Sequence, residues 1–365
     1  MNAPFSWQNK RVFLTGHTGF KGGWLALWLA SKGAIVRGYA LDPCTNPSLF
    51  DTAHIGSQIE DIRGDIRNPA TLEPALKDFA PEVVFHLAAQ PLVRLSYDDP
   101  ILTYETNVIG TARVLEAIRQ TPSVRAVLSI TTDKCYENIE DPHHSYRESD
   151  PLGGYDPYSS SKACAELVSS AYRQSYFPTA KIAEHHVALA TARAGNVIGG
   201  GDWSLDRLLP DLVRGFLSGE PVRIRRPQSI RPWQHVLEPL HGYISLAEHL
   251  LAEDRTAAAR HATAYNFGPA DSDAQPVSWI VDKMTTFWGD GATWVLDPDP
   301  GVHEAGYLKL DASRAHHDLN WQPHLNLETA LQWLVAWYRA WQSGKDMNAF
   351  TLNQIKKYES LLAQN

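Results

Sequence analysis

A glycine-rich turn near the start of the chain limits most strongly what this sequence can fold into. The string T-G-H-T-G-F-K-G-G, residues 15–23, lies between an apolar strand pattern at 10–14 and an apolar helical stretch. A strand, a glycine-rich turn and a helix in this order are typical of a site that holds a dinucleotide pyrophosphate. Gly16 permits the tight turn, Gly19 lets the backbone approach a phosphate, and Gly22 lets the helix pack against the strand. The helix N-terminus then offers free N–H groups to the anion.

A second apolar strand pattern, residues 34–40, ends just before Asp42. A carboxylate at this place accepts hydrogen bonds from both ribose hydroxyls, which favours NAD over NADP. Arg37 is the alternative, as a partner for a 2′-phosphate, but it lies inside the strand pattern. The sequence therefore predicts NAD as the cofactor.

Strand and helix patterns alternate from about residue 10 to residue 190. This alternation predicts parallel βαβ units and an α/β fold. Further strand patterns end in residues that suit a cofactor, with Asp65 and Ile66 as a predicted adenine contact and the small residues at 87–89 allowing close approach. After residue 193 the chain becomes richer in proline, arginine and tryptophan, and we expect a substrate lobe to begin there.

Tyr158 and Lys162 are four residues apart in a helical pattern, so they project from one helix face. An ammonium beside a phenol favours the phenolate, and we expect the pKa of Tyr158 to fall towards that of a usable general base. The alternative is that both are ordinary helix-surface residues, because this spacing is common. The dinucleotide motif favours the catalytic interpretation.

The composition argues against several classes of partner. A net charge of −8 and a pI near 6.0 argue against non-specific binding to nucleic acid. No apolar stretch approaches the roughly 20 residues that span a bilayer. The three cysteines show neither metal-ligand spacing nor a disulfide set, which predicts reduced thiols in a cytoplasmic protein. Adjacent histidine pairs lack a carboxylate or cysteine at metal spacing, so no metal site is expected.

Several motifs occur together in a familiar order: Thr-Gly-x-x-Gly-Phe-x-Gly, then Leu87-Ala88-Ala89, Asn107, and Tyr158-x-x-x-Lys162. As a set they resemble the extended short-chain dehydrogenases/reductases that act on nucleotide sugars, over nearly the whole chain. The resemblance implies a Rossmann-type doubly wound parallel sheet with a smaller C-terminal α/β lobe for the substrate. It also implies a discontinuous division: an NAD-binding domain over 1–190 plus about 236–262, and a nucleotide-sugar domain over about 191–235 plus 263–365. A homodimer or dimer of dimers is expected.

Within this family, the segment Thr132-Asp133-Lys134-Cys135-Tyr136 resembles the catalytic segment of sugar-nucleotide 4,6-dehydratases. Members that act on dTDP-glucose or GDP-mannose carry Glu after the Asp, where this chain has Lys134. That departure, together with Arg-Pro-Trp-Gln-His-Val at 231–236, is similar to the branch that acts on CDP-glucose in the synthesis of deoxysugars for O-antigen polysaccharides.

The resemblance implies a three-step reaction, because the C5 proton of a hexose becomes acidic only once C4 is a ketone. Hydride leaves C4 for the cofactor, water is lost across C5 and C6, and the hydride returns to C6. Tyr158 is implied as the base for the C4 hydroxyl, assisted by Lys162, and Thr132 as a hydrogen-bond partner of the C4 oxygen. Asp133 is implied as the acid at C6, and Lys134, as a neutral amine, as the base at C5.

The predicted cofactor contacts are Gly16, Thr18, Gly19, Phe20, Gly22, Asp42, Asp65, Ile66, Leu87, Ala88, Ala89, Asn107, Tyr158, Lys162 and Arg193. The family pattern points to substrate contacts at Arg94, Asn196, Arg207, Arg231, Asn266 and Tyr307. Arg231 follows the one dense basic run, 223–226, which is otherwise a solvated surface face. A guanidinium grips phosphate oxygens in bidentate fashion.

Three other functions remain open from the sequence. A nucleotide-sugar 4-epimerase shares the fold, NAD, Tyr and Lys, but has no use for an Asp-Lys pair beside the Thr. A 4,6-dehydratase for another nucleotide sugar would differ only in the base that it recognises. A catalytically silent protein that senses NAD would not need every catalytic position filled, as they are here.

Overall fold

The computed structural model describes residues 5–298 and 306–364. Its centre is a seven-stranded sheet in the order β11-β6-β5-β4-β1-β2-β3, and every neighbouring pair is parallel. The predicted α/β class with a doubly wound parallel sheet is therefore confirmed. The strands are β1 (Arg11–Thr15), β2 (Ile35–Ala40), β3 (Glu60–Arg63), β4 (Val83–His86), β5 (Ala126–Ile130), β6 (Ala188–Ala194) and β11 (Ala264–Phe267).

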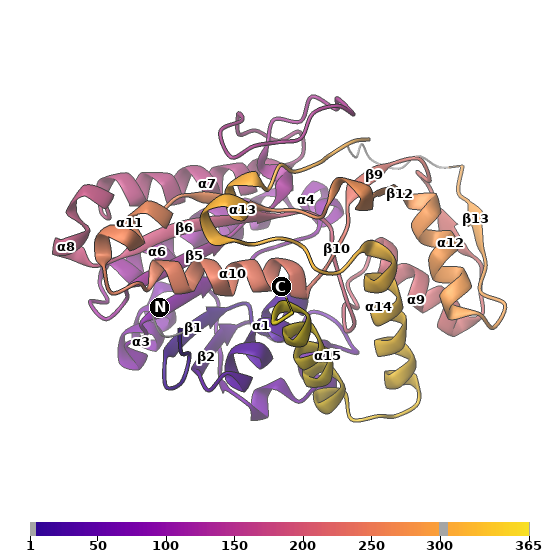
Figure 1. Ribbon diagram of the computed structural model, residues 1–365, viewed down its shortest axis with the longest axis horizontal. Helices are drawn as coiled ribbons and strands as arrows, with labels where there is room; N and C mark the ends of the chain where they lie inside the picture. The colour runs from indigo at the N-terminus through magenta and orange to yellow at the C-terminus, as the bar shows by residue number, and fades with distance from the viewer. Residues whose placement is uncertain (1–4, 299–305, 365) are drawn as a thin grey trace.

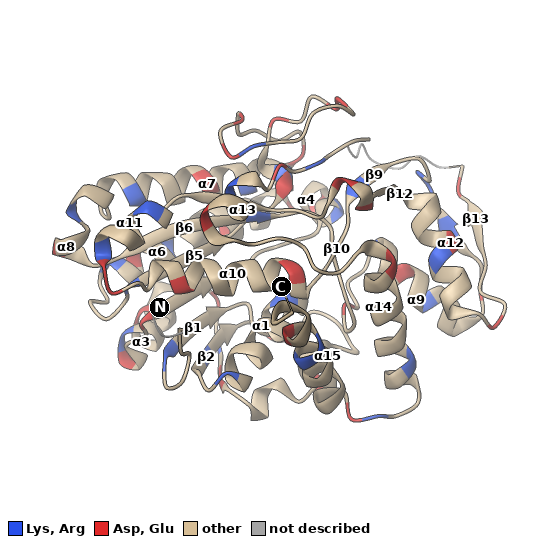
Figure 2. Ribbon diagram, in the orientation of Figure 1, with Lys and Arg blue, Asp and Glu red and all other residues tan. Residues whose placement is uncertain are grey.

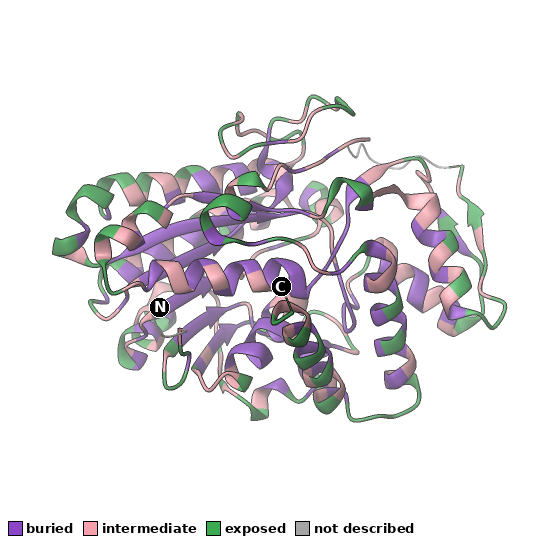
Figure 3. Cartoon of the chain, in the orientation of Figure 1, coloured by how far each residue is buried: buried purple, intermediate pink, exposed green. Residues whose placement is uncertain are grey.

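The sheet is covered on both faces, which explains why its central strands are nearly continuous apolar runs. Successive side chains of β1 point to opposite faces: Val12 and Leu14 join one buried cluster and Phe13 the other. The first cluster includes α1 (Phe20–Ser31) and α10 (Leu237–Leu250). Figure 3 shows the sheet almost wholly buried, and Figure 1 shows the helices packed around it.

The opposite face of the sheet is covered by three longer helices. They are α3 (Pro69–Phe79), α6 (Gly110–Arg119) and α7 (Pro157–Ser175). The remaining helices are α2 (Leu49–Thr52), α4 (Val93–Asp98), α5 (Pro100–Tyr104), η2 (Glu105–Ile109), α8 (Ile182–His185), α11 (Arg255–His261), α13 (Ser313–Leu319), α14 (Leu327–Gln342) and α15 (Met347–Leu362), with short 3-10 turns η1 (Ile55–Ser57), η3 (Asp133–Cys135), η4 (Thr179–Lys181) and η5 (Asp271–Asp273). Charged side chains are scattered over these outer helices in Figure 2.

A smaller group of elements lies beyond the main sheet, at the right of Figure 1. It contains three small pairs of strands: β13 with β8, β12 with β9, and β10 with β7. Its elements are β7 (Val197–Ile198), α9 (Leu208–Ser218), β8 (Val222–Ile224), β9 (Ile230–Pro232), β10 (Gln234–His235), β12 (Ala274–Pro276), α12 (Val277–Trp288) and β13 (Trp294–Leu296).

The chain returns to the main sheet through α10, and the return continues past the expected residue 262. β11 pairs with β6 in parallel, with Ala264 opposite Thr191. The C-terminal helix α15 also lies against α1, where the Trp28 indole donates to Glu359 at 2.8 Å. The main sheet and its helical layer thus include two segments that the sequence analysis assigned to the second lobe. No helix within the described ranges combines the length and apolar character of a membrane span.

Candidate active site

A cavity of about 350 Å³ opens at the carboxyl ends of the central strands, between the sheet and the smaller lobe. Parallel α/β sheets bind their ligands at this edge. The wall combines residues that are far apart in the sequence, from the glycine-rich turn to α12. The sequence-predicted residues that line it are Phe20, Leu87, Ala89, Arg94, Thr132, Asp133, Lys134, Tyr158, Lys162, Asn196, Arg207 and Arg231.

The glycine-rich turn is packed too closely for side chains at two of its positions. Gly16 has φ +80°, and a Cβ there would lie 2.7 Å from the backbone nitrogen of Ala88. A Cβ on Gly22 would lie 2.1 Å from the carbonyl oxygen of Gly16. The turn is fixed to the end of β4 because the Thr15 hydroxyl accepts from the N–H groups of Leu87 and Ala88, each at 3.1 Å. Such a bare backbone surface fits a pyrophosphate.

The other predicted cofactor contacts lie around this turn but not on the cavity wall. The Thr18 hydroxyl donates to the carbonyl of Leu41 at 3.0 Å, which places the turn next to Asp42. The Asp42 side chain is 88% exposed and therefore accessible to a ribose, and Arg63 Nε lies 3.7 Å from its carboxylate. Asp65 forms a shorter ion pair, with Arg67 at 2.6 Å.

Ile66 and Asn107 lie behind the turn as packing and bracing residues. Ile66 is buried beneath Gly110, where an added Cβ would meet its Cδ1 at 2.6 Å. The Asn107 amide donates to the carbonyl of Gln90 at 3.0 Å and to the Ser161 hydroxyl at 2.9 Å. Asn107 therefore ties the end of β4 to α7, next to Lys162.

The catalytic segment predicted from the sequence follows β5 directly as the short turn η3. Thr132 precedes it, and its hydroxyl donates to Asp133 Oδ1 at 2.9 Å. Asp133 is buried, and burial raises its pKa, although Lys134 and Arg231 oppose the rise. A carboxyl group that favours its protonated form is suited to donate a proton.

Helix α7 carries Tyr158 and Lys162 into the same cavity. Its start is fixed by the N-cap Asp156, which accepts from the N–H of Ser159 at 2.9 Å, and by Pro157 at the first helical position. The Lys162 amine donates to the carbonyl of Ile130, the last residue of β5, at 3.5 Å. Burial lowers the pKa of Lys162 to about 8.

Tyr158 differs from the expectation drawn from its sequence. Burial raises its pKa to about 12, because desolvation of the phenolate outweighs the favourable effects of Thr132 and Arg207. Lys162 is not among the groups that lower it. The prediction that Lys162 lowers the pKa of Tyr158 is thus wrong.

A family model described as GDP-mannose 4,6 dehydratase matches residues 13–333. The chain belongs to this family. A CDP-glucose 4,6-dehydratase from Salmonella typhimurium is 54% identical over 354 residues, which are 97% of each chain. A dTDP-glucose 4,6-dehydratase from Xanthomonas campestris is 26% identical and covers 94% of this chain and 97% of its own.

Solved structures of related enzymes share the fold of this dehydratase-family chain. A UDP-glucuronic acid 4-epimerase from Bacillus cereus gives a TM-score of 0.75 at 21% identity, over 90% of this chain and 99% of its own. A dTDP-glucose 4,6-dehydratase from Streptomyces venezuelae, with NAD bound, gives 0.74 at 22% identity, over 92% of this chain and 99% of its own. The shared fold thus spans both lobes.

Cationic side chains are concentrated in the cavity of this family member. Arg207 donates to Asp202 at 3.0 Å, and Arg94 pairs with Asp206 at 2.7 Å. The buried Arg231 guanidinium donates to two backbone carbonyls. The basic run 223–226 also lines the wall, where Arg223 is exposed and Arg225 and Arg226 are half-buried.

Sequence reasoning missed Lys21, which lies in the glycine-rich string and lines the cavity half-buried. Burial, together with the neighbouring cations Lys162 and Arg207, lowers its pKa to about 7. The available signal was a basic residue between Gly19 and Gly22, at the start of the helix. The direction in which the Lys21 side chain points depends on the residue at which that helix begins. The motif alone does not give that residue.

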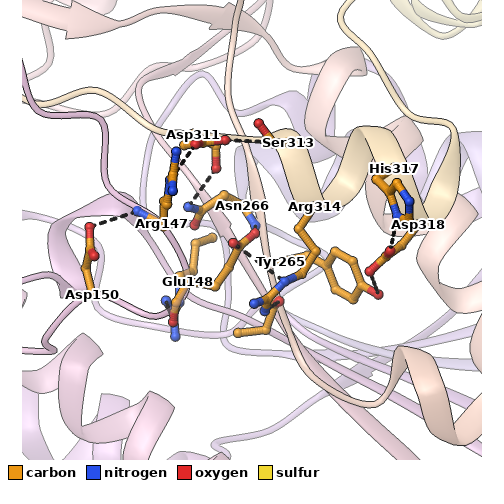
Figure 4. A network of polar contacts seen from close by, with 12 residues as sticks. Arg147, Glu148, Asp150, Tyr265, Asn266, Asp311, Ser313, Arg314, His317 and Asp318 are labelled. Carbon is orange, nitrogen blue, oxygen red and sulfur yellow. Dashed lines mark hydrogen bonds and ion pairs between the residues drawn. The ribbon is translucent and has the colours of Figure 1, made fainter.

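Three further predicted site residues also lie off the cavity wall and are held by contacts within the protein. Arg193 is buried against Glu166, with two hydrogen bonds of 2.9 Å. Asn266 belongs to the polar network of Figure 4, where its amide donates to the carbonyls of Tyr146 and Asp311. Tyr307 forms a backbone bridge with Ile230. These contacts favour structural over ligand-binding roles.

Proposed function

We propose that the protein is an NAD-dependent CDP-glucose 4,6-dehydratase, which converts CDP-glucose into CDP-4-dehydro-6-deoxy-D-glucose and water. The observation that carries the proposal is one cavity that contains both the Tyr158–Lys162 pair and the Asp133–Lys134 pair. A 4-epimerase has no step that needs the second pair. The 54% identity to a CDP-glucose 4,6-dehydratase supports the nucleotide assignment.

The residues present fit NAD, because the turn around Gly16 and Gly22 leaves no room for side chains and Asp42 offers an exposed carboxylate beside it. When bound, NAD accepts a hydride from the sugar and returns it. Thr18, Phe20 and the backbone at 87–89 would flank it. Lys162 would hold the ribose nearest the reacting carbon.

The protein side chains divide the proton transfers between them. Tyr158 takes the proton of the C4 hydroxyl, and Arg207 already favours the phenolate that this requires. Thr132 hydrogen-bonds the C4 oxygen. Asp133 delivers a proton to the departing C6 hydroxyl, and burial, by raising the pKa of that carboxyl, favours the protonated form that this step needs. Lys134 removes the C5 proton.

The substrate's diphosphate would bind to the cationic side of the cavity. Arg207 and Arg231 are the primary candidates because guanidinium groups form bidentate bonds with phosphate. Asn196 and Arg94 lie on the same wall, and the run 223–226 supplies further positive charge. We further propose a cytoplasmic homodimer or dimer of dimers, whose product serves the synthesis of deoxysugars for O-antigen polysaccharide.

A mass measurement tests this function. The purified protein, supplied with NAD, is incubated separately with CDP-glucose, dTDP-glucose, UDP-glucose and GDP-mannose. We expect a product lighter by one water from CDP-glucose at the highest rate. A product of unchanged mass would favour an epimerase, and preference for another nucleotide would overturn the base assignment.

A further inference from the structure

Glu166 is a buried carboxylate that receives hydrogen bonds from β6 and from Thr131, the residue that follows β5. It lies on α7, one helical turn beyond Lys162. One oxygen accepts from the Thr131 hydroxyl at 2.5 Å and from Arg193 Nε at 2.9 Å. The other accepts from the Thr191 hydroxyl at 2.7 Å and from Arg193 Nη2 at 2.9 Å. The carboxylate is thereby saturated with donors.

These bonds fix α7 against the part of β5 that leads into the catalytic segment. Thr131 stands between Ile130, whose carbonyl accepts from the Lys162 amine, and Thr132, which donates to Asp133. A shift of α7 relative to β5 would therefore move the Tyr158–Lys162 pair relative to the Asp133–Lys134 pair. Arg193 extends the contact, since it also donates at 2.8 Å to the hydroxyl of Tyr136, the last residue of the catalytic segment.

Glu166 is also the negative charge that faces Lys162. Within residues 5–298 and 306–364, the structure gives Lys162 no direct ion pair. The titratable groups around its amine come from four elements: Tyr158 and Glu166 of α7, Asp133 and Cys135 of η3, Lys21 of α1, and His86 of β4. Burial raises the pKa values of Asp133 and Cys135, which favours their neutral forms.

Burial alone would raise the pKa of Glu166 as well. The hydrogen bonds from Arg193, with those from Thr131 and Thr191, more than offset burial and leave this pKa lowered. The lowered pKa favours the ionised form of Glu166, and Glu166 raises the pKa of Lys162 against the effect of burial.

We propose that Glu166, clamped by Arg193, is a positioning residue that aligns Lys162 with the Thr132–Lys134 segment and supplies the counter-charge of the buried lysine. The catalytic part of this inference rests on the proposed function. Arg193, which the sequence suggested as a cofactor contact, acts through Glu166 instead.

The charge component is tested in the double variant Glu166→Gln/Arg193→Met. Removing only one partner leaves an uncompensated buried charge, so the double variant is expected to melt at a higher temperature than Glu166→Gln alone. Its NAD affinity, measured by calorimetry across pH 6 to 10, should decline at a pH lower by about one unit than in the wild type. The decline moves to lower pH because Lys162, without its counter-charge, loses its proton at lower pH.

The alignment component is tested at Thr131, without disturbing the ion pair. Thr131→Val removes the hydroxyl that joins β5 to Glu166, while Thr131→Ser retains it. We expect Val to lower kcat at least ten-fold with little change in KM for CDP-glucose, and Ser to stay within a few-fold of wild type. These two variants keep the proposal testable if the double variant does not fold.

Glu238→Gln is the matched control, because Glu238 is a buried carboxyl on α10 that accepts from Tyr358 and from backbone N–H groups away from the cavity. It should lower the melting temperature and leave the pH dependence of NAD affinity unchanged. The proposal is overturned if the folded double variant binds NAD with the wild-type pH dependence, or if Thr131→Val retains wild-type kcat. NAD affinity can be read even if CDP-glucose is not the substrate, so the two proposals fail separately.

Discussion

Tyr158, Asp133 and Lys162 lie in one cavity, and burial acts on each of them in the direction of its neutral form. It raises the pKa of the tyrosine and of the aspartic acid, and it lowers that of the lysine. For Asp133 this favours the acid that the reaction needs. For Tyr158 it opposes the base, so the phenolate must be stabilised by cations that surround it in the working complex.

The first prediction concerns Tyr158→Phe, which removes the hydroxyl and leaves the ring to pack. General bases contribute about 10²–10⁴-fold to rate, so turnover of CDP-glucose should fall by about that factor. The melting temperature should change little, because the buried ring is retained. Turnover within a few-fold of wild type would remove Tyr158 from the role of base.

The second prediction separates Lys134 from Asp133 by isotope exchange. Lys134→Met keeps a long apolar stem and deletes the C5 base, so solvent deuterium should enter C5 of the sugar slowly or not at all. Asp133→Asn should permit some exchange at C5 and block loss of the C6 hydroxyl. The measurement is mass spectrometry of recovered CDP-sugar from reactions in D₂O.

The two variants serve as each other's control, because both should be nearly inactive in overall turnover while differing in exchange. Exchange at the wild-type rate in Lys134→Met would assign the C5 base to another residue. Lys21 would then be the first candidate, since it lines the same cavity and burial lowers its pKa to about 7.

At the scale of single elements, the third prediction concerns the glycine-rich turn before α1. Gly22→Ala places a Cβ within 2.1 Å of the Gly16 carbonyl, so the turn must shift away from the position that suits a pyrophosphate. NAD affinity, measured by calorimetry, should fall more than ten-fold, or about 1.4 kcal/mol.

Gly219→Ala is the control for a glycine substitution that spares the site. Gly219 follows α9 with φ +71°, and a Cβ there meets nothing within 4 Å. The strained backbone should cost about 1 kcal/mol of stability and leave NAD affinity unchanged. Equal losses of NAD affinity in both variants would show that the glycine-rich turn is not a specific binding site for NAD.

Sequence reasoning succeeded where the controlling interactions are local. The glycine turn, the helical spacing of Tyr158 and Lys162, and the alternation of strands and helices all depend on neighbours within a few residues. The contact of Arg193 with Glu166 could not be predicted, because Glu166 comes from another element and meets it only in the folded chain. The pKa of Tyr158 was misjudged because a sequence pattern gives spacing but not burial.

At the scale of the whole molecule, the described structure leaves several large apolar side chains exposed on one group of helices. Ile101 of α5 is 67% exposed, Ile109 of η2 is 50% exposed and Leu167 of α7 is 58% exposed. α7 packs against both α5 and η2, so the three belong to one helical layer. Exposed apolar residues concentrated on one layer favour an interface.

The fourth prediction is that this layer of α5, η2 and α7 forms the interface of the proposed dimer. Ile109→Glu/Leu167→Glu places two like charges in each half of a two-fold interface, where they would be desolvated without partners. Light scattering at micromolar concentration should give a dimer or larger for the wild type and a monomer for this variant.

Ile139→Glu is the control, because it changes a side chain that is 65% exposed outside these helices, and it should leave the assembly intact. A monomeric wild type would exclude the interface. An unchanged assembly in the double variant would place the interface elsewhere, because the charge pair cannot be accommodated in a buried apolar contact.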